Sequence, residues 1–208
     1  MPFGAAVFGD PGHWVHKLPG KLLHNVLDHI LNKVVEFMPD DTPAVTAFGS
    51  RLSTMHYGDH RDDILDEVRI LLRGRKVTAF GLFSSSARPV GHSYRVFGTK
   101  NTAIVDLNAR TATLDVTTRM PSAIGRLGPA VEQTVVFGRE ALANLGQFMR
   151  SEFDFFNGLR ALLTRFYASI VDGAPLPISY RDMLRVTAMM DEVFRQLDTQ
   201  TAQARGRR

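Results

Sequence analysis

The side chains best suited to proton chemistry gather near the start of the chain, within residues 13–29. Asn25 and His29 are four residues apart, so on a helix they share one face, with Lys33 one turn further along. An imidazole presented beside an amide can give or take a proton near neutral pH. The pair formed by Asn25 and His29 is therefore one candidate for acid–base catalysis.

Two alternatives to this assignment stay open. His24 and Asp28 form a second pair four residues apart, and these two residues could be the active pair instead. A polar face opposite an apolar stripe is also what an ordinary solvated amphipathic helix presents. The spacing by itself favours that solvated face over an active site.

Further polar and aromatic residues surround this pair in the sequence. The candidate substrate-binding residues are His13, Trp14, His16, Lys17 and His24. No metal site is predicted, because the first two histidines fall in a loop, the chain has no cysteine, and no spacing fixes a third ligand.

Several motifs that carry cofactors or nucleophiles are missing from the sequence. It contains no G-x-G, and therefore no dinucleotide fingerprint, and no G-x-x-x-x-G-K-[ST] phosphate loop. It also lacks a G-x-S-x-G elbow and a cysteine nucleophile. We expect the chain by itself to bind no nucleotide cofactor.

The apolar pattern predicts the elements that position these residues. A helix starts near Lys21 and ends at Pro39, and short alternating runs separated by turns predict antiparallel strands between Pro43 and Val116. Helices are predicted over 138–150, over 159–170, and from an N-cap at Ser179. The last helix carries an apolar stripe formed by Met183, Leu184, Thr187, Met190, Val193, Phe194 and Leu197. This order predicts an α+β fold with one large, predominantly antiparallel sheet and helices packed on one face.

Length and composition indicate one globular domain over residues 1–198, followed by a disordered basic tail over 199–208. Three arginines in that tail supply most of the formal net charge of +4, so nucleic acid is not an expected partner. The absence of cysteine is typical of a cytoplasmic protein. No apolar run reaches the roughly 20 residues of a membrane helix, so no membrane partner is expected.

The predicted strand around residues 77–83 is apolar on both faces. Phe80 and Leu82 lie on one face, and Ala79 and Phe83 lie on the other. Helices can cover only one of these faces, and the other would form an exposed patch of roughly several hundred Å². We expect self-association through this face, as a homodimer or a larger oligomer.

The stretch Gly12–His29 resembles the segment with which the second domain of Gfo/Idh/MocA oxidoreductases begins. That segment has two glycines followed by Asp-x-x-x-His on a helix. Gly20 matches the first glycine, Lys21 stands at the second, Asn25 at the aspartate and His29 at the histidine. Residues 94–106 and 173–194 resemble the hairpin and the closing helix of the same domain.

This resemblance implies a substrate-binding half of an NAD- or NADP-dependent dehydrogenase acting on a sugar, cyclitol or related polyol. In the family, the histidine moves the hydroxyl proton, and a Rossmann domain with a Glu-Lys-Pro motif binds the cofactor. This chain contains no Glu-Lys-Pro, so we expect it to lack the Rossmann domain and to be inactive alone, with a separate nucleotide-binding domain as a partner. The alternative is a non-catalytic oligomer or binding module with the same fold.

Overall fold

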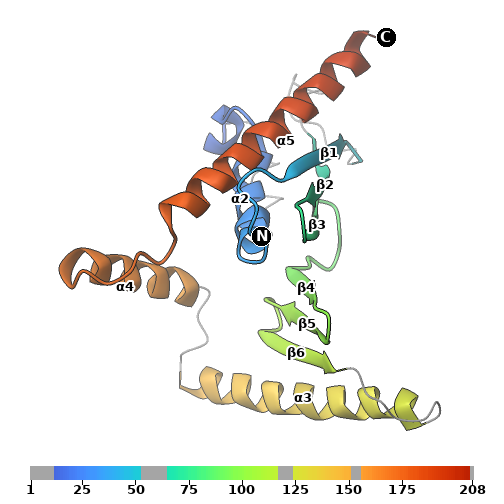
Figure 1. Ribbon diagram of the computed structural model, residues 1–208, viewed down its shortest axis with the longest axis vertical. Helices are drawn as coiled ribbons and strands as arrows, with labels where there is room; N and C mark the ends of the chain where they lie inside the picture. The colour runs from blue at the N-terminus through green and yellow to red at the C-terminus, as the bar shows by residue number, and fades with distance from the viewer. Residues whose placement is uncertain (1–11, 53–64, 117–123, 151–155, 207–208) are drawn as a thin grey trace. The chain divides into compact units, whose positions relative to one another are not determined.

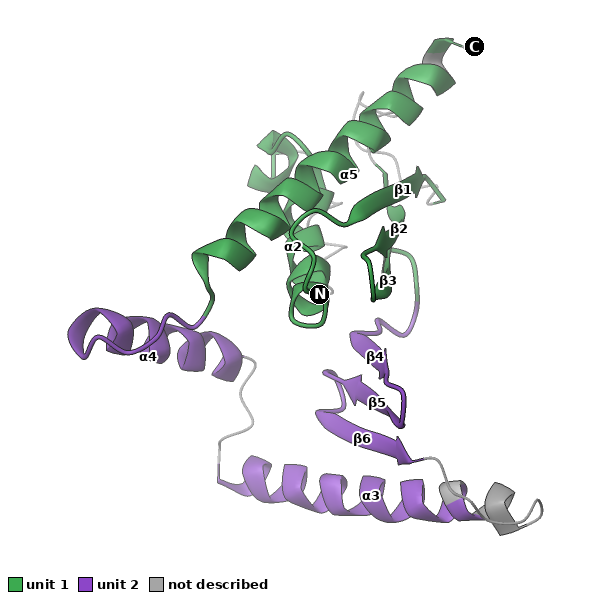
Figure 2. Ribbon diagram, viewed as in Figure 1, with its two compact units in different colours: residues 1–87, 178–208 green, residues 88–177 purple. Residues whose placement is uncertain are grey.

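The computed structural model describes residues 12–52, 65–116, 124–150 and 156–206 (Figure 1). The chain divides into two compact units, one formed by Met1–Ala87 with Ile178–Arg208 and the other by Arg88–Pro177 (Figure 2). The single domain predicted for residues 1–198 stays a prediction, and each unit is described by itself.

The first unit packs two helices on one face of a three-stranded sheet. Its elements are η1 (Trp14–Lys17), α2 (Lys21–Val35), β1 (Ala44–Ser50), β2 (Glu67–Arg73), β3 (Thr78–Ser84) and α5 (Tyr180–Gly206). The strands are antiparallel in the order β1-β2-β3, α5 packs on β1, and α2 packs on β3. The buried core between the layers consists of Leu23, Leu27, Leu31, Val35, Met38, Ala47, Val68, Ile70, Leu72, Val186, Met189, Val193 and Leu197.

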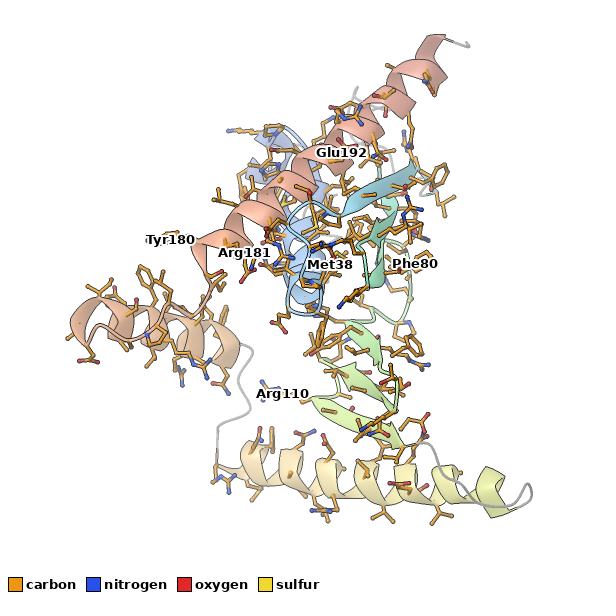
Figure 3. The ribbon with its side chains drawn as sticks, in the orientation of Figure 1. Met38, Phe80, Arg110, Tyr180, Arg181 and Glu192 are labelled. Carbon is orange, nitrogen blue, oxygen red and sulfur yellow. The ribbon has the colours of Figure 1, made fainter. Side chains whose placement is uncertain are left out.

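The pleat of this sheet sends alternate residues to the helices and to the opposite face. Ile70 pairs with Gly81 on the helix side, where a Cβ at Gly81 would lie 2.8 Å from a methyl carbon of Ile30. On the other face Phe80 is 80% exposed and Leu82 is 64% exposed, and Phe80 points away from the helices (Figure 3). The helices thus cover one face of the sheet, while the other exposes Phe80 and Leu82 beside the charged Arg69.

A buried arginine joins α5 to the turn between α2 and β1. The guanidinium of Arg185, only 7% exposed, donates to the backbone carbonyls of Met38 and Asp40, with Nη2 lying 2.7 Å from the Asp40 oxygen. The Asp40 carboxylate accepts from Arg75 Nε at 3.0 Å, and this hydrogen bond holds the pKa of Asp40 below its ordinary value despite partial burial. Arg185 of α5 and Arg75, which follows β2, thus both bind this turn.

Two glutamines of α5 complete the free edge of β1. Gln196 accepts from the amide of Ala47 at 2.8 Å and donates to the carbonyl of Val45 at 2.8 Å. One turn later, Gln200 accepts from Gly49 and donates to Ala47. Because these contacts extend the packing of α5 beyond residue 198, the helix continues to Gly206 through most of the segment predicted to be disordered.

The second unit contains a second three-stranded antiparallel sheet and two helices. Its elements are β4 (Ser93–Phe97), β5 (Asn101–Asp106), β6 (Thr111–Val116), α3 (Ile124–Met149) and α4 (Asn157–Val171), and α3 packs on β6. Glu140 of α3 accepts from the amide of Ala112, and Asn144 donates to the carbonyl of Ala109 at 2.9 Å. In the parts of the chain that the structure describes, no helix combines the length and apolar character that a membrane crossing requires.

The structure confirms the α+β class and the antiparallel pairing. The strands form two three-stranded sheets rather than one large sheet, because the segment between β3 and β4, which contains Pro89 and Gly91, forms no strand. Ser179 caps α5 as predicted, accepting from the amide of Asp182 at 3.0 Å. The helix predicted over 138–150 instead begins at Ile124.

The Arg185 contacts predict a large loss of stability when they are removed. Arg185→Ala should lower the free energy of unfolding by about 2–4 kcal/mol, because buried carbonyls lose charged donors. Arg195→Ala is the control on the same helix, since its ion pair with Glu192 is exposed and should contribute at most about 1 kcal/mol. Urea unfolding measures both. Equal losses for the two variants would contradict the role given to Arg185.

Candidate functional site

The core side of α2 determines which of its residues remain available for chemistry. Its apolar residues Leu22, Leu23, Leu27, Leu31 and Val35 are buried. Asn25 and His29 lie on the opposite side of the helix, where Asn25 is half-buried and the His29 side chain is 65% exposed. The predicted pair therefore shares one accessible helix face, as its spacing required.

The start of α2 has an unusual backbone. Gly20 precedes the helix, and a Cβ there would lie 2.4 Å from the ring of Phe194 on α5. Lys21 has φ = 49°, in the left-handed region that favours glycine. The close approach favours glycine at position 20, and the positive φ favours glycine at position 21. Only position 20 is a glycine.

Lys33 extends the polar face one turn beyond His29. Its Nζ donates to the backbone carbonyl of His29 at 2.9 Å. Burial lowers the pKa of the Lys33 ammonium, and the attraction of Glu36 and Asp28 opposes this shift only in part. An ammonium group thus lies beside the backbone of the candidate acid–base residue.

Asp28 lies next to His29 on this helix. Its Oδ1 atom is 3.7 Å from Nδ1 of His29, and the structure gives this buried oxygen no hydrogen-bond partner. His24 instead turns toward α5 and stacks on Phe194, with ring centroids 5.4 Å apart and an interplanar angle of 14°. The alternative pair of His24 and Asp28 is therefore not brought together, whereas Asp28 and His29 are neighbours.

The residues predicted to bind substrate before α2 form the short helix η1. Nδ1 of His13 accepts from the amide of Val15 at 3.3 Å, and the His13 ring lies 5.6 Å from Trp14 and 6.5 Å from His16 between centroids. Val15 is buried against Leu22, which holds η1 beside the first turn of α2. Three of the predicted residues thus form one aromatic cluster, with Lys17 exposed at its end.

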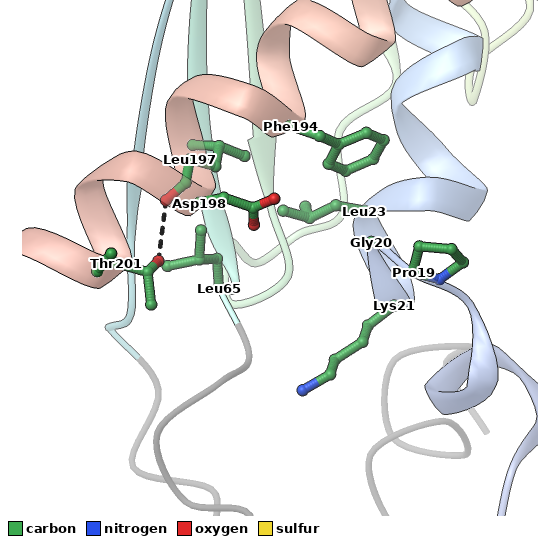
Figure 4. Close-up of a pocket in the computed structure, with 10 residues that line it drawn as sticks. Pro19, Gly20, Lys21, Leu23, Leu65, Phe194, Leu197, Asp198 and Thr201 are labelled. Atoms are coloured by element: carbon green, nitrogen blue, oxygen red, sulfur yellow. Dashed lines mark hydrogen bonds between the residues drawn. The ribbon is translucent and has the colours of Figure 1, made fainter. Parts of the chain in front are cut away.

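A pocket of about 350 Å³ opens between the start of α2 and the C-terminal half of α5 (Figure 4). Its lining consists of Pro19, Gly20, Lys21, Leu23, Leu65, Phe194, Leu197, Asp198, Thr201 and Ala202. Asp198 and Lys21 supply its charges, while the Thr201 hydroxyl donates to the Leu197 carbonyl at 2.9 Å. None of the predicted catalytic or substrate-binding residues lines it, although Gly20 and Lys21, the two glycine positions of the resemblance, do.

The described residues contain no arrangement suited to a dinucleotide or a metal ion. Every strand pairing among them is antiparallel, whereas a dinucleotide cradle requires a parallel β-α-β unit. No three histidine, aspartate or glutamate side chains in those residues lie close enough together to hold a metal. The chemistry these residues can perform is hydrogen bonding and proton exchange on the open face of α2.

Comparisons with known proteins find one similar solved structure and no matching family. No family model matches the sequence, and no curated protein matches it. Among solved structures, it is similar to a Bacillus subtilis protein named "putative oxidoreductase yvaA", with a TM-score of 0.46 and 12% identity. The match covers 86% of this chain and 49% of that one, so the chain spans about half the length of that protein. Because the TM-score is below 0.5, this likeness supports no conclusion about function.

The positive φ of Lys21 predicts that glycine is the better residue there. Lys21→Gly and Lys21→Ala both remove the side chain, but only glycine adopts the left-handed region without a Cβ penalty. The glycine variant should exceed the alanine variant by about 1 kcal/mol in the free energy of unfolding, measured in urea. If alanine were equally stable, Lys21 could not be held in the left-handed conformation.

Proposed function

We propose that this chain is the substrate-binding half of an NAD(P)-dependent oxidoreductase of the Gfo/Idh/MocA type, acting on a sugar, cyclitol or similar polyol. The observation that carries the proposal is the left-handed φ of Lys21, directly after Gly20 and at the head of the helix that presents Asn25 and His29. The resemblance places a glycine at this position, and φ = 49° is the conformation that glycine favours.

The roles of the residues follow from their chemistry. The Asn25 amide can donate to one hydroxyl of a polyol and accept from another, but it cannot take up a proton at neutral pH. The His29 imidazole can accept the proton of a hydroxyl bound beside that amide. The exposed Trp14, beside His13 and His16, offers an apolar ring against which the carbon face of a sugar can lie.

In this proposal, a nicotinamide cofactor would supply the hydride acceptor. The described residues do not fit such a cofactor, because they lack a β-α-β unit and the sequence lacks the glycine fingerprint. NAD or NADP would therefore be held by a separate nucleotide-binding domain. The residues of this chain position the substrate and hold its proton.

A non-catalytic oligomer or binding module is the second candidate function. Two observations favour it: Asn25 replaces the acid expected from the resemblance, and the outer face of the first sheet exposes Phe48, Phe80 and Leu82. A module of this kind would self-associate through the outer face of the first sheet and would bind no polyol.

The proposal predicts different kinetic effects for substitutions of His29 and Asn25. With the nucleotide-binding domain supplied, His29→Ala should lower kcat by roughly 10²-fold, because an acid–base group is lost. Asn25→Ala should mainly raise KM, because the amide binds substrate without transferring protons. Steady-state kinetics with a polyol and NAD or NADP measures both. An active His29→Ala enzyme with an unchanged pH profile would show that the assignment is wrong.

A binding measurement tests the proposal on the chain itself. Titration with myo-inositol or D-glucose should shift the NMR signals of the Asn25 side-chain amide and the His29 imidazole, and Asn25→Ala should weaken the binding. His92 of the second unit provides an internal reference that should not move. No shift with either compound would favour the non-catalytic module.

The exposed sheet face predicts self-association. Light scattering should show a dimer or a larger oligomer at tens of micromolar, because apolar side chains on this face gain by leaving water. Phe80→Glu should dissociate it, since the contact would bury a charge. Tyr180→Glu is the matched control, because Tyr180 is 71% exposed but lies at the start of α5. A monomeric wild type would exclude this contact.

A further inference from the structure

Asp28 has a buried carboxylate oxygen that lacks a donor. The structure gives its Oδ1 atom no hydrogen-bond partner, although the side chain as a whole is 40% exposed. Buried polar atoms in folded proteins nearly always have a partner, because an unpaired one loses its hydration without compensation. We therefore expect a hydrogen-bond donor close to this oxygen.

Two neighbouring donors on α2 make hydrogen bonds to backbone oxygens, although the Lys33 ammonium is also attracted by the Asp28 carboxylate. Asn32 Nδ2 donates to the backbone carbonyl of Asp28 at 2.9 Å, and Lys33 Nζ donates to that of His29 at 2.9 Å. Both side chains thus bond backbone oxygens one turn before them. Nδ1 of His29 lies 3.7 Å from Asp28 Oδ1, which is beyond the hydrogen-bond range of about 2.7–3.2 Å.

Little has to move to close this distance. The His29 side chain is 65% exposed, so its ring can turn without disturbing the core. We propose that Nδ1–H of His29 donates to Oδ1 of Asp28, and that Asp28 is a positioning residue for the histidine. Because the bond at one ring nitrogen determines which nitrogen carries the proton, Nε2 is left as the open acceptor.

This arrangement supplies a carboxylate where the helix otherwise has an amide. Asn25, four residues before His29, cannot hold a negative charge, whereas Asp28 can stabilise the imidazolium that forms when Nε2 takes a proton. The use of this pair in proton transfer rests on the proposed function. The hydrogen bond does not, since it follows from the surroundings of Asp28 alone.

The side-chain nitrogens of His29 test the proposal directly. In the ¹⁵N-labelled full chain, long-range ¹H–¹⁵N correlation spectra distinguish the two neutral tautomers, and loss of signals in His29→Gln assigns the residue. Neutral His29 should carry its proton on Nδ1. Asp28→Ala should abolish this preference and shift the two ring nitrogens toward the Nε2–H pattern.

Glu36→Ala is the matched control, because it removes one carboxylate near the end of the same helix without touching this pair, and it should leave the tautomer unchanged. A wild-type His29 protonated on Nε2 would overturn the proposal, as would a pattern that Asp28→Ala does not alter. If Asp28→Ala fails to fold, the wild-type tautomer alone decides. If His29 carries its proton on Nδ1 but the chain binds no polyol, the proposed hydrogen bond is supported and the proposed function is excluded.

Discussion

The first unit depends on a buried guanidinium. Arg185 leaves water on folding, and its charge is tolerated only because the carbonyls of Met38 and Asp40 accept its protons and Asp182 pairs with it at 2.9 Å. Those carbonyls belong to the turn between α2 and β1. One side chain of α5 therefore holds the turn that joins α2 to the sheet.

Polar side chains on helices also protect the sheets. In the first unit, Gln196 and Gln200 complete the hydrogen bonding of β1, while in the second, Glu140 bonds β6 and Asn144 bonds the turn before it. Each pair is spaced four residues apart, so both members face the strand. Edge strands with unpaired backbone groups promote aggregation, and these side chains occupy some of those groups.

The candidate site is a consequence of how α2 is held. Phe194 packs where Gly20 has no side chain, and the same ring stacks on His24. This contact places the His24 ring against α5, while burial of the apolar stripe of α2 directs Asn25 and His29 to the other side of the helix. The position of α2, and with it that of His29, thus depends on a residue of α5 that lies far away in the sequence.

Local pattern was sufficient for much of the secondary structure. Alternation in the strands and the spacing of leucines in α2 predicted the α+β class, the antiparallel pairing and the shared face of Asn25 and His29, because periods of two and of about 3.6 residues are local properties of the backbone. Ser179 predicted the start of α5 for the same reason, since its hydroxyl bonds an amide only three residues away.

Contacts between residues far apart in the sequence determined the features that local pattern did not predict. The apolar stripe predicted for α5 included Met183 and Leu184, yet both are exposed while Arg185 and Val186 are buried, because the turn after α2 offers carbonyls to a guanidinium. The extension of α5 past residue 198 accompanies its hydrogen bonds to the edge of β1, and the His24 ring stacks on Phe194 of α5. Such partners lie too far apart in the sequence for any local periodicity to identify them, so only the tertiary structure could make these assignments.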